Sequence, residues 1–459
     1  MSSGAQTQPL RVLIVTDQYE PMVGGVPTVT RNLARGLAGR GHAVAVVAPS
    51  TTRHGHRAGV TTGEAAGKEA GGQVAVDFRA SVPWPWYEGQ RLGILPPARV
   101  GELISAFAPD VVHLHSPLTL GAAARPAARR RAVPVVYTNH YLPLNVWPAS
   151  AGAKQTGRRA SRARDAAFYA YVTGFANRCD LVTAPTATAL RLLRDHGLRA
   201  PSKAVSNGVD LDRFSPGPGR REEAAALRSK YGLPAGRPLV LSVGRLSPEK
   251  RADVLIAAVA RLPSADGTSA SETSADETRG DETSTGNTGG AEGEAPVLVL
   301  AGTGPDEGRL RSLARHYGVA DRVRFPGFVA EDDLPGLYRL ADVFAIASEA
   351  ELQSLVTMAA MASGLPVVAV DAGALAELVH VGENGFLARP GHAGEIAVSL
   401  GLLCRDADLR ARMSKASSRI IAGHDGHRLL TRWESIYRAL ASPRTAEACG
   451  TVEQHSKRR

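Results

Sequence analysis

The strongest constraint on the fold is a repeated alternation between short apolar runs and amphipathic stretches. Arg11–Thr16 is an apolar, β-branched run, and a polar, glycine-containing loop, Asp17–Pro27, follows it. From Thr28 apolar residues recur every four positions, as on an amphipathic helix, and Ala43–Ala48 returns to a strand pattern. The same order recurs at 111–138. This pattern predicts an open parallel α/β sheet, in which ligands bind at the carboxyl ends of the strands.

A second series of strands follows a turn-rich connection near residue 206 and a charged helix at 222–231. Its strands are expected at Leu239–Val243, Val297–Ala301, Val323–Phe325, Val343–Ile346 and Pro366–Val370. Because helical segments separate these runs, the second half is also predicted to be an α/β domain. We therefore expect one domain at 1–205 and another at 206–422, with a frayed tail at 443–459.

The segment 264–295 interrupts one helix-to-strand connection of the second domain. It is acidic, rich in Ser, Thr and Gly, and almost free of large apolar residues. Such a composition cannot bury enough surface to offset the entropy of ordering, so we expect a disordered loop. A neutral surface insertion is the favoured interpretation over a binding tail, because lengthening a loop costs little more closure entropy.

Composition and charge limit the class of protein. A chain of 459 residues can hold two or three domains, and its three cysteines include no close pair that would suggest a disulfide framework or a zinc site. No run of about 18 apolar residues occurs, and the start does not resemble a signal peptide, so a cytoplasmic protein is expected. The net charge of +10 allows an anionic partner. Nucleic acid is not favoured, because no aromatic stacking platform or reader motif is present.

Two basic residues follow the first strand of the second domain. Gly244 and Arg245 come directly after Leu239–Val243, and Lys250 lies five residues beyond Arg245. At the carboxyl end of a strand, such cations can converge on one diphosphate, although a solvated loop is the other interpretation. The glycines after Val297–Ala301 do not form a dinucleotide fingerprint, because the third comes one place late and no tight strand-to-helix entry is expected there. A dehydrogenase is therefore set aside.

Other candidate residues also follow strands or precede helices. Gly24 and Gly25 stand before the first helix, where a backbone can approach a phosphate closely, although a flexible turn explains them nearly as well. His140 follows the strand at 133–138, and a lone histidine there is more often structural. Glu351 precedes a helix-like run, Leu355–Ala362. A carboxylate beside a helix N-terminus suits an anionic ligand that also carries hydroxyls, such as a sugar phosphate.

Several motifs together resemble one known family. They are PMVGGVPT, DVVHLHSP, TNHYLPLN, SNGVDLDRFSPG, VGRLSPEKR, LAGTGPDEGRL, VRFPGFV and GENGFLARPG, and they extend over nearly the whole chain. The chain resembles the retaining glycosyltransferases of family 4, which have the GT-B fold of two Rossmann-like, doubly wound parallel-sheet domains facing across a cleft. The resemblance implies a nucleotide-sugar donor, no catalytic metal and no other cofactor. It also implies that a last helix, 423–442, crosses back to the first domain.

The resemblance also assigns site residues. Arg245 and Lys250 would bind the donor diphosphate, Glu351 would hold hydroxyls of the donor sugar, and His140 would lie near that sugar. The donor would also be contacted by three glycines, an aromatic residue near the base and the start of the Leu355 helix. These residues are Gly24, Gly25, Gly244, Phe328, Leu352, Ser354 and Leu355.

One position departs from the family pattern. The family has a second glutamate eight positions after the first, where this chain has Ala359. That glutamate usually binds the donor ribose, and losing one charged hydrogen bond costs on the order of 1.5–3 kcal/mol of donor affinity. Starting the pattern at Glu349 puts Thr357 at the second place and does not restore the pair. A non-catalytic or weakened nucleotide-sugar or anion binder is therefore the alternative function.

The acceptor is expected in the first domain. Arginines at 158–164 precede an apolar face formed by Phe168, Tyr171, Val172 and Phe175. They could form a basic patch on an anionic membrane, or the helix could simply pack on its domain. The expected patch comprises Arg129, Arg130, Arg158, Arg159 and Arg162. The segments AELQS and TNHYLP resemble those of the glycolipid-synthesising branch of the family. This resemblance implies UDP-glucose or GDP-mannose as donor and a membrane lipid as acceptor. It also implies a place on the inner face of the cell membrane.

Overall fold

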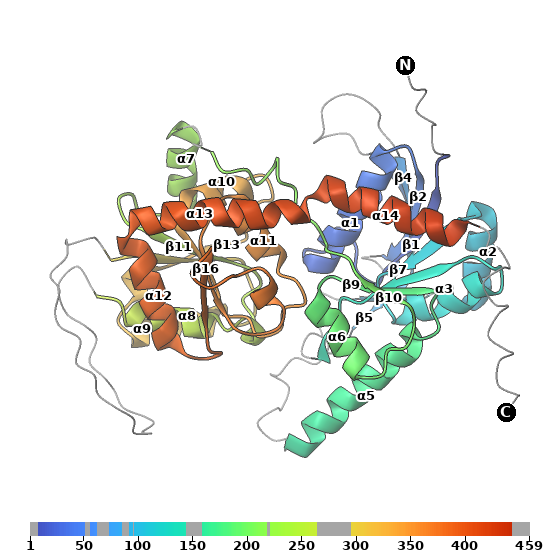
Figure 1. Ribbon diagram of the computed structural model, residues 1–459, viewed down its shortest axis with the longest axis horizontal. Helices are drawn as coiled ribbons and strands as arrows, with labels where there is room; N and C mark the ends of the chain where they lie inside the picture. The colour runs from blue at the N-terminus through green and yellow to red at the C-terminus, as the bar shows by residue number, and fades with distance from the viewer. Residues whose placement is uncertain are drawn as a thin grey trace, which may run out of the picture.

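The computed structural model describes residues 8–50, 56–61, 73–84, 91–94, 96–143, 158–217, 221–263 and 295–442. These residues form two separate α/β sheets with helices around each (Figure 1). The prediction of two parallel-sheet units is confirmed. The predicted insertion, apart from Ala295, and the predicted tail lie outside the described residues.

The first sheet has the strand order β10-β9-β8-β7-β1-β2-β4-β3 and is parallel except for the edge strand β3, which runs antiparallel to β4. Crossover helices cover it, and a short antiparallel pair, β5 (Ser81–Pro83) and β6 (Arg91–Gly93), lies outside it. The strands of the sheet are β1 (Arg11–Val15), β2 (Ala43–Pro49), β3 (His56–Thr61), β4 (Gln73–Arg79), β7 (Val111–Leu114), β8 (Val135–Thr138), β9 (Leu181–Ala184) and β10 (Ser202–Ala204). Its helices are α1 (Gly25–Gly39), α2 (Pro97–Phe107), α3 (Thr119–Arg129), α5 (Arg158–Ala176) and α6 (Ala187–Asp195).

Both faces of this sheet are buried, because successive side chains of a strand point to opposite faces. On β1, Leu13 and Val15 join a cluster with residues of α2, α3, α5 and α6. Val12 and Ile14 join the cluster on the other face, with residues of α1 and of the last helix, α14 (Gly426–Ala441). Two-sided burial explains why the central strands read as continuous apolar runs.

The second sheet is parallel throughout, in the order β13-β12-β11-β14-β15-β16, and one large apolar cluster fills its two faces. Its strands are β11 (Leu239–Val243), β12 (Val297–Ala301), β13 (Val323–Gly327), β14 (Val343–Ile346), β15 (Val367–Val370) and β16 (Gly385–Ala388). Its helices are α7 (Arg221–Tyr231), α8 (Ala252–Ala260), α9 (Glu307–His316), α10 (Leu334–Leu340), α11 (Leu355–Ala362), α12 (Ala393–Arg405) and α13 (Ala407–Ile421).

The end of the chain returns to the first sheet. In Figure 1, α13 lies over the second unit and α14 over the first. Trp433, Ile436 and Tyr437 are buried in the same cluster as Val12 and Ile14 of β1. The last helix therefore ties the two halves together.

Two local expectations need correction. Helix α1 begins at Gly25, earlier than Thr28, because Pro27 fits the first turn of a helix. The glycine loop after β12 does enter a helix directly, since α9 begins at Glu307. Gly302 and Gly304 are needed there because a Cβ atom would lie 1.9 Å from the Gly244 oxygen and 2.1 Å from the Leu246 oxygen, respectively.

None of the helices in the described part of the chain is long and apolar enough to cross a membrane.

Candidate functional site

The carboxyl ends of the two sheets approach each other around the N-termini of α1 and α11. A Cβ atom placed on Gly25 would lie 3.9 Å from Leu355 Cδ1. Nearby, the Thr186 hydroxyl of the first half donates a hydrogen bond to the Leu352 carbonyl oxygen of the second, at 2.8 Å. Residues far apart in sequence therefore meet at the edge where parallel α/β sheets bind ligands.

The central pair of this edge is Lys250 and Glu351. Lys250 ends a short 3₁₀ turn after β11, and Glu351 belongs to residues 347–354 between β14 and α11, which we call the carboxylate loop. Lys250 Nζ lies 2.7 Å from Glu351 Oε1, and the side chains are 35% and 10% exposed. A parallel pair lies beside it, where Arg251 Nη1 is 2.8 Å from Glu349 Oε1.

The backbone around Glu351 is fixed by the next loop of the sheet. Ala374 N donates a hydrogen bond to the Glu351 carbonyl oxygen at 2.9 Å. Gly373 has a φ of 57°, and a Cβ atom there would lie 2.5 Å from the same oxygen. Glycine is therefore required at this position, and the carboxylate is held on a rigid support.

The residues that start α11 have different surroundings. The Ser354 hydroxyl caps the helix by accepting from Thr357 N at 3.3 Å and also accepts from the Thr357 hydroxyl at 2.8 Å. Leu352 is buried in the apolar cluster of the first half. The side chains of Leu352 and Ser354 are thus engaged in packing and capping, and Leu355 and Val356 at this helix start are half-buried.

Three other predicted donor-binding residues lie at the ends of β11 and β13. Arg245 is half-buried, and the neighbouring Leu246 bonds through its backbone to Thr303 at 2.9 Å. Gly244 has a φ of 154°, which favours glycine. Phe328 follows β13 and is 58% exposed, so its ring is available for stacking.

His140 belongs to a stack of three histidines that includes His113 and His115 of the DVVHLHSP motif. His140 Nε2 and His115 Nδ1 are 2.9 Å apart, with ring centroids at 5.2 Å and planes inclined by 10°. His113 also packs against His115, at 4.0 Å between centroids and with the ring planes inclined by 40°. Burial lowers the pKa of His140 to about 4 and holds the pKa of His113 and His115 well below the usual range.

The stack continues into the last helix. His113 Nδ1 is 2.7 Å from the Tyr437 hydroxyl of α14, and His113 Nε2 is 2.6 Å from the Thr138 hydroxyl. Trp433 packs against the same ring at 4.6 Å between centroids. The sequence analysis did not identify His113 or His115, although His-x-His in a strand places both side chains on one face.

Asp17 is a further residue that the sequence analysis missed. Its side chain is 2% exposed directly beyond β1, and Oδ1 accepts from the Thr119 hydroxyl at 3.0 Å. Its Oδ2 and the buried Tyr141 hydroxyl have no hydrogen-bond partner among the described residues. Burial raises the pKa of Asp17, and hydrogen bonds from Ser116 and Thr119 partly oppose this. The signal was a polar residue at the carboxyl end of the first strand.

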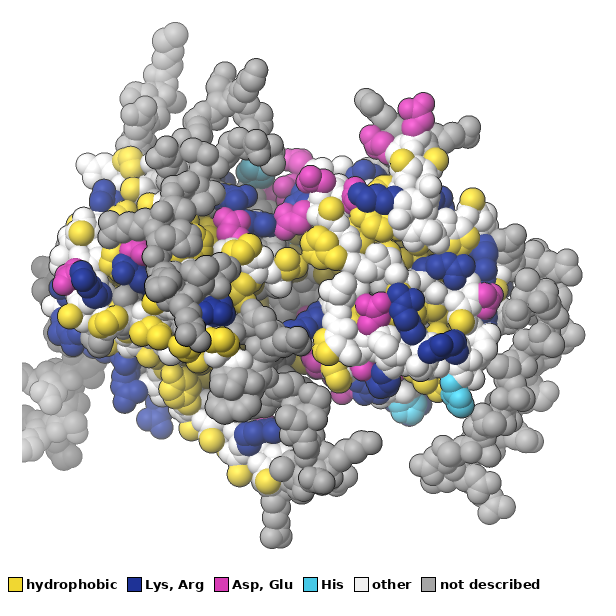
Figure 2. All heavy atoms as spheres, turned by 180° about the vertical axis from the view of Figure 1, so that it is seen from behind, with side chains coloured by type: hydrophobic (Ala, Val, Ile, Leu, Met, Phe, Trp, Pro, Cys, Tyr) yellow, Lys and Arg dark blue, Asp and Glu magenta, His cyan; other side chains and the backbone are white. Residues whose placement is uncertain are grey.

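The expected basic patch is only partly formed by the described side chains. Arg130 and Arg162 are exposed, Arg129 donates to the Arg178 carbonyl oxygen at 3.3 Å, and the side chains of Arg158 and Arg159 lie outside the described residues. Figure 2 shows Lys and Arg side chains spread over both halves of one face, with acidic and hydrophobic side chains between them.

The apolar face expected beside these arginines is mostly core. Val172 is fully buried and Phe175 is 6% exposed, whereas Tyr171 is 50% exposed. The interpretation of α5 as a helix packed on its own domain is therefore correct for Val172 and Phe175.

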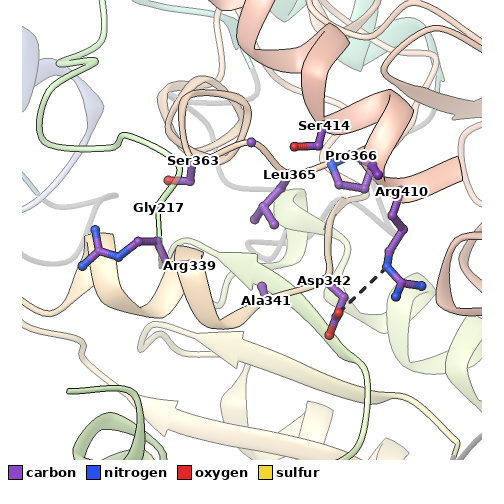
Figure 3. A pocket seen from close by; sticks show the side chains of 11 residues that line it. Gly217, Arg339, Ala341, Asp342, Ser363, Leu365, Pro366, Arg410 and Ser414 are labelled. Carbon is purple, nitrogen blue, oxygen red and sulfur yellow. Dashed lines mark ion pairs between the residues drawn. The ribbon is translucent and has the colours of Figure 1, made fainter. Parts of the chain in front are cut away.

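A pocket elsewhere on the second unit does not belong to this site. Asp342 and Pro366, which line it, precede β14 and β15 at their amino ends, the edge opposite to Glu351 (Figure 3). In this pocket, Arg410 Nη1 donates a hydrogen bond to the Leu403 carbonyl oxygen at 2.6 Å, and Arg410 Nε lies 3.9 Å from Asp342 Oδ1. Among the described residues, no group of three or more His, Cys, Asp or Glu side chains is placed to hold a metal ion.

Comparison with known families gives two adjoining matches. The model named Glycosyltransferase Family 4 matches residues 23–213, and the model named Glycosyl transferases group 1 matches residues 223–419. The two matches together extend over the second sheet, including the carboxylate loop, and over the first sheet except for β1.

Individual relatives are similar over most of the chain. The GDP-mannose-dependent alpha-mannosyltransferase of Mycobacterium tuberculosis is 30% identical over 82% of this chain and 83% of that protein. The alpha-monoglucosyldiacylglycerol synthase of Streptococcus pneumoniae is 26% identical over 78% of this chain and 71% of that protein. The structure of HepE from Anabaena in complex with UDP-glucose matches 93% of this chain and 99% of its own, with a TM-score of 0.65 and 21% identity.

Proposed function

The chain belongs to family 4 of the retaining glycosyltransferases and has their GT-B fold, and from this we propose that it transfers glucose or mannose from UDP-glucose or GDP-mannose to a membrane lipid. The transfer of a sugar from a nucleotide-sugar is the activity of the family. The named donors and the lipid acceptor are the proposal, and they are supported by a relative that uses GDP-mannose and by one that makes a glycosylated diacylglycerol.

The observation that carries the proposal is the Lys250–Glu351 pair at the meeting edge of the two sheets. We infer that Lys250 and Arg245 bind the donor diphosphate, while Glu351 accepts hydrogen bonds from sugar hydroxyls. In the absence of donor, the ammonium and the carboxylate neutralise each other. When a nucleotide-sugar binds, its diphosphate can replace Glu351 as the partner of Lys250. Its sugar hydroxyls can replace Lys250 as the partners of Glu351.

The chemistry that these residues supply is charge stabilisation. Negative charge develops on the leaving nucleoside diphosphate as the glycosidic bond breaks, and fixed cations lower that barrier. We propose that Arg245 and Lys250 perform this function without a catalytic metal, and that Gly25 lets the backbone at the start of α1 approach the phosphate. The free N–H groups of that helix start would add to the positive field.

The two halves of the chain have different proposed binding functions. We propose that residues 1–205 bind the acceptor, that residues 206–422 bind the donor, and that the helix at 423–442 joins them. Exposed Arg130 and Arg162 support contact with anionic lipid headgroups at the inner face of a membrane. Val172 and Phe175 are core residues, so in this proposal electrostatic attraction dominates the membrane contact of α5.

The experiment compares two carboxylates of the same loop. In correctly folded protein, Glu351→Gln is expected to reduce transfer at least tenfold, whereas Glu349→Gln, which disrupts the neighbouring Arg251 pair, should leave transfer within about twofold. Lys250→Ala is expected to reduce transfer to about the same extent as Glu351→Gln. Equal rates for Glu351→Gln and wild type would refute the site assignment.

Donor and acceptor are identified in the same preparation. A panel of nucleotide-sugars is tested by thermal shift, because a ligand of the folded state raises its apparent stability by mass action. The bound donor is then offered with diacylglycerol, phosphatidylinositol and their monoglycosylated forms. Donor binding without transfer or donor hydrolysis would favour the alternative, a binder weakened by Ala359.

A further inference from the structure

We propose that His115 is a positioning residue that fixes His140 in a single neutral tautomer, with the proton on Nδ1 offered to the ligand cleft. His140 follows β8 at the edge where the carboxylate loop packs, and the family comparison assigns no role to His115. The tautomer of His140 does not depend on the proposed function. Only the identity of the group that its N–H binds rests on that function.

The geometry of the two rings restricts the protons. The contact between His115 Nδ1 and His140 Nε2, at 2.9 Å, needs one hydrogen. A neutral imidazole carries one N–H, so the nitrogen that donates in this contact decides the tautomer of both rings. Burial of both rings favours the neutral forms, and the pKa of His140 is lowered to about 4.

Either His115 Nδ1 or His140 Nε2 can donate in this contact, and the surroundings of His115 show which of them does. Its Nε2 is buried and has no hydrogen-bond partner among the described residues. If His140 donated, His115 would carry its proton on this nitrogen, as a buried N–H without an acceptor. Unpaired buried N–H groups are rarer in proteins than underused acceptors. His115 Nδ1 therefore donates, and His140 Nε2 accepts.

His140 then carries its own proton on Nδ1. No described residue is hydrogen-bonded to that nitrogen, and His140 as a residue is more exposed than the fully buried His113 and His115. An N–H directed from this edge can bind an oxygen acceptor, which on a nucleotide-sugar is a hydroxyl or a phosphate oxygen. The family-derived position of His140 near the sugar fits such a donor.

The rest of the stack holds His115 in place. His113 lies 4.0 Å from it between ring centroids and is itself hydrogen-bonded to Tyr437 and Thr138. His140 is stacked on the same ring and is hydrogen-bonded to it, so the His115 ring cannot turn without losing both neighbours. Helix α14 thus supports the orientation of a residue at the proposed active site.

The test reads the tautomer directly in the full chain labelled with ¹⁵N-histidine. The chain has 13 histidines, and His140→Gln assigns the relevant signals. Long-range ¹H–¹⁵N correlation at pH 7 is expected to show His140 with a protonated Nδ1 and a bare Nε2. His115→Asn should keep this pattern, since the amide N–H can replace Nδ1–H, whereas His115→Leu should shift His140 toward the Nε2–H form.

A wild-type His140 protonated on Nε2 would overturn the proposal, and so would an unchanged spectrum in folded His115→Leu. If His115→Leu does not fold, the wild-type spectrum and His115→Asn decide. In the transfer assay, His115→Leu is expected to lower kcat at least tenfold with KM for the donor changed less than threefold, and His115→Asn should restore most of kcat. Absence of transfer in wild type would refute the proposed function but leave the tautomer result standing.

Discussion

Replacing Ala359 with glutamate tests whether this position limits donor affinity. Ala359 is 6% exposed in the middle of α11 and lies four residues after Leu355, so both side chains are on the same helix face. Leu355 of that face approaches Gly25 across the meeting edge. Side chains on a helix lean toward its N-terminus, so the introduced carboxylate would extend toward that edge.

The expected gain is that of one charge-assisted hydrogen bond to a ribose hydroxyl. Such a bond contributes about 1.5–3 kcal/mol, which lowers the donor Kd roughly 10- to 150-fold. Without donor, the carboxylate lies in a largely buried place, which raises its pKa and lowers the free energy of unfolding. Ala359→Glu should therefore melt below wild type but gain more stabilisation from saturating donor.

Titration calorimetry with the donor selected by the panel measures this effect, and Ala359→Gln is the matched control. The amide has the same length without the charge, so about 0.5–1.5 kcal/mol is expected from it, or roughly a 2- to 12-fold lower Kd. A folded Ala359→Glu protein with the Kd of wild type would show that the ribose is held by other groups. It would also remove the reason to regard Ala359 as a weakened site.

Two further predictions concern buried polar groups of the first half. Tyr437→Phe removes the hydroxyl that lies 2.7 Å from His113 Nδ1, and the nitrogen left unpaired should lower the free energy of urea unfolding by about 1–3 kcal/mol; a loss below about 0.3 kcal/mol would contradict it. Asp17→Asn tests the raised pKa of Asp17. The folded state holds the Asp17 proton more tightly than the unfolded chain, so ionisation costs stability as pH rises through the raised pKa. The stability of Asp17→Asn relative to wild type should therefore grow from about pH 4 to pH 7, and a difference that shrinks over this range would refute the assignment.

The central strands could be predicted to the residue because both of their faces are buried. The expected bounds of β11, β12 and β14 agree with the structure, as do those of α11. These strands are largely apolar runs, and a glycine directly follows β11 and β12. Edge strands lack this signal: β3 reads HRAGVT and pairs on one side only, so no continuous run identified it.

A recurrent aspartate before the apolar run would have located one strand that was missed. Asp110 Oδ2 accepts from Arg11 N at 2.7 Å, and Asp342 Oδ2 accepts from Leu239 N at 2.8 Å. Each carboxylate thus pairs with the first backbone N–H of the neighbouring strand. Asp180 does the same with Val135 N at 2.9 Å, directly before β9. An aspartate that bonds in this way directly precedes three parallel strands, β7, β9 and β14.

The partners within the site could not be predicted, because they depend on which strands are neighbours. Lys250 and Glu351 meet because β11 and β14 are adjacent in the sheet although they are distant in sequence. His115 and His140 meet because β7 and β8 are adjacent. Sequence patterns placed His140, Lys250 and Glu351 at strand ends, but pairing required the strand order.

The carboxylate loop is held by contacts from both halves of the molecule. Thr186 of the first half bonds the Leu352 carbonyl oxygen, one residue from Glu351. Glu377, just beyond β15, accepts from Thr188 N at 2.6 Å and Ala187 N at 3.2 Å at the start of α6. A carboxylate is stabilised at a helix N-terminus, so this contact favours the observed arrangement, in which the two halves touch. Moving the halves apart would break both contacts, whereas the bond from Ala374 N to the Glu351 carbonyl oxygen lies within the second half and would remain. The loop that carries Glu351 therefore has its full set of supports only while the first half is docked against the second.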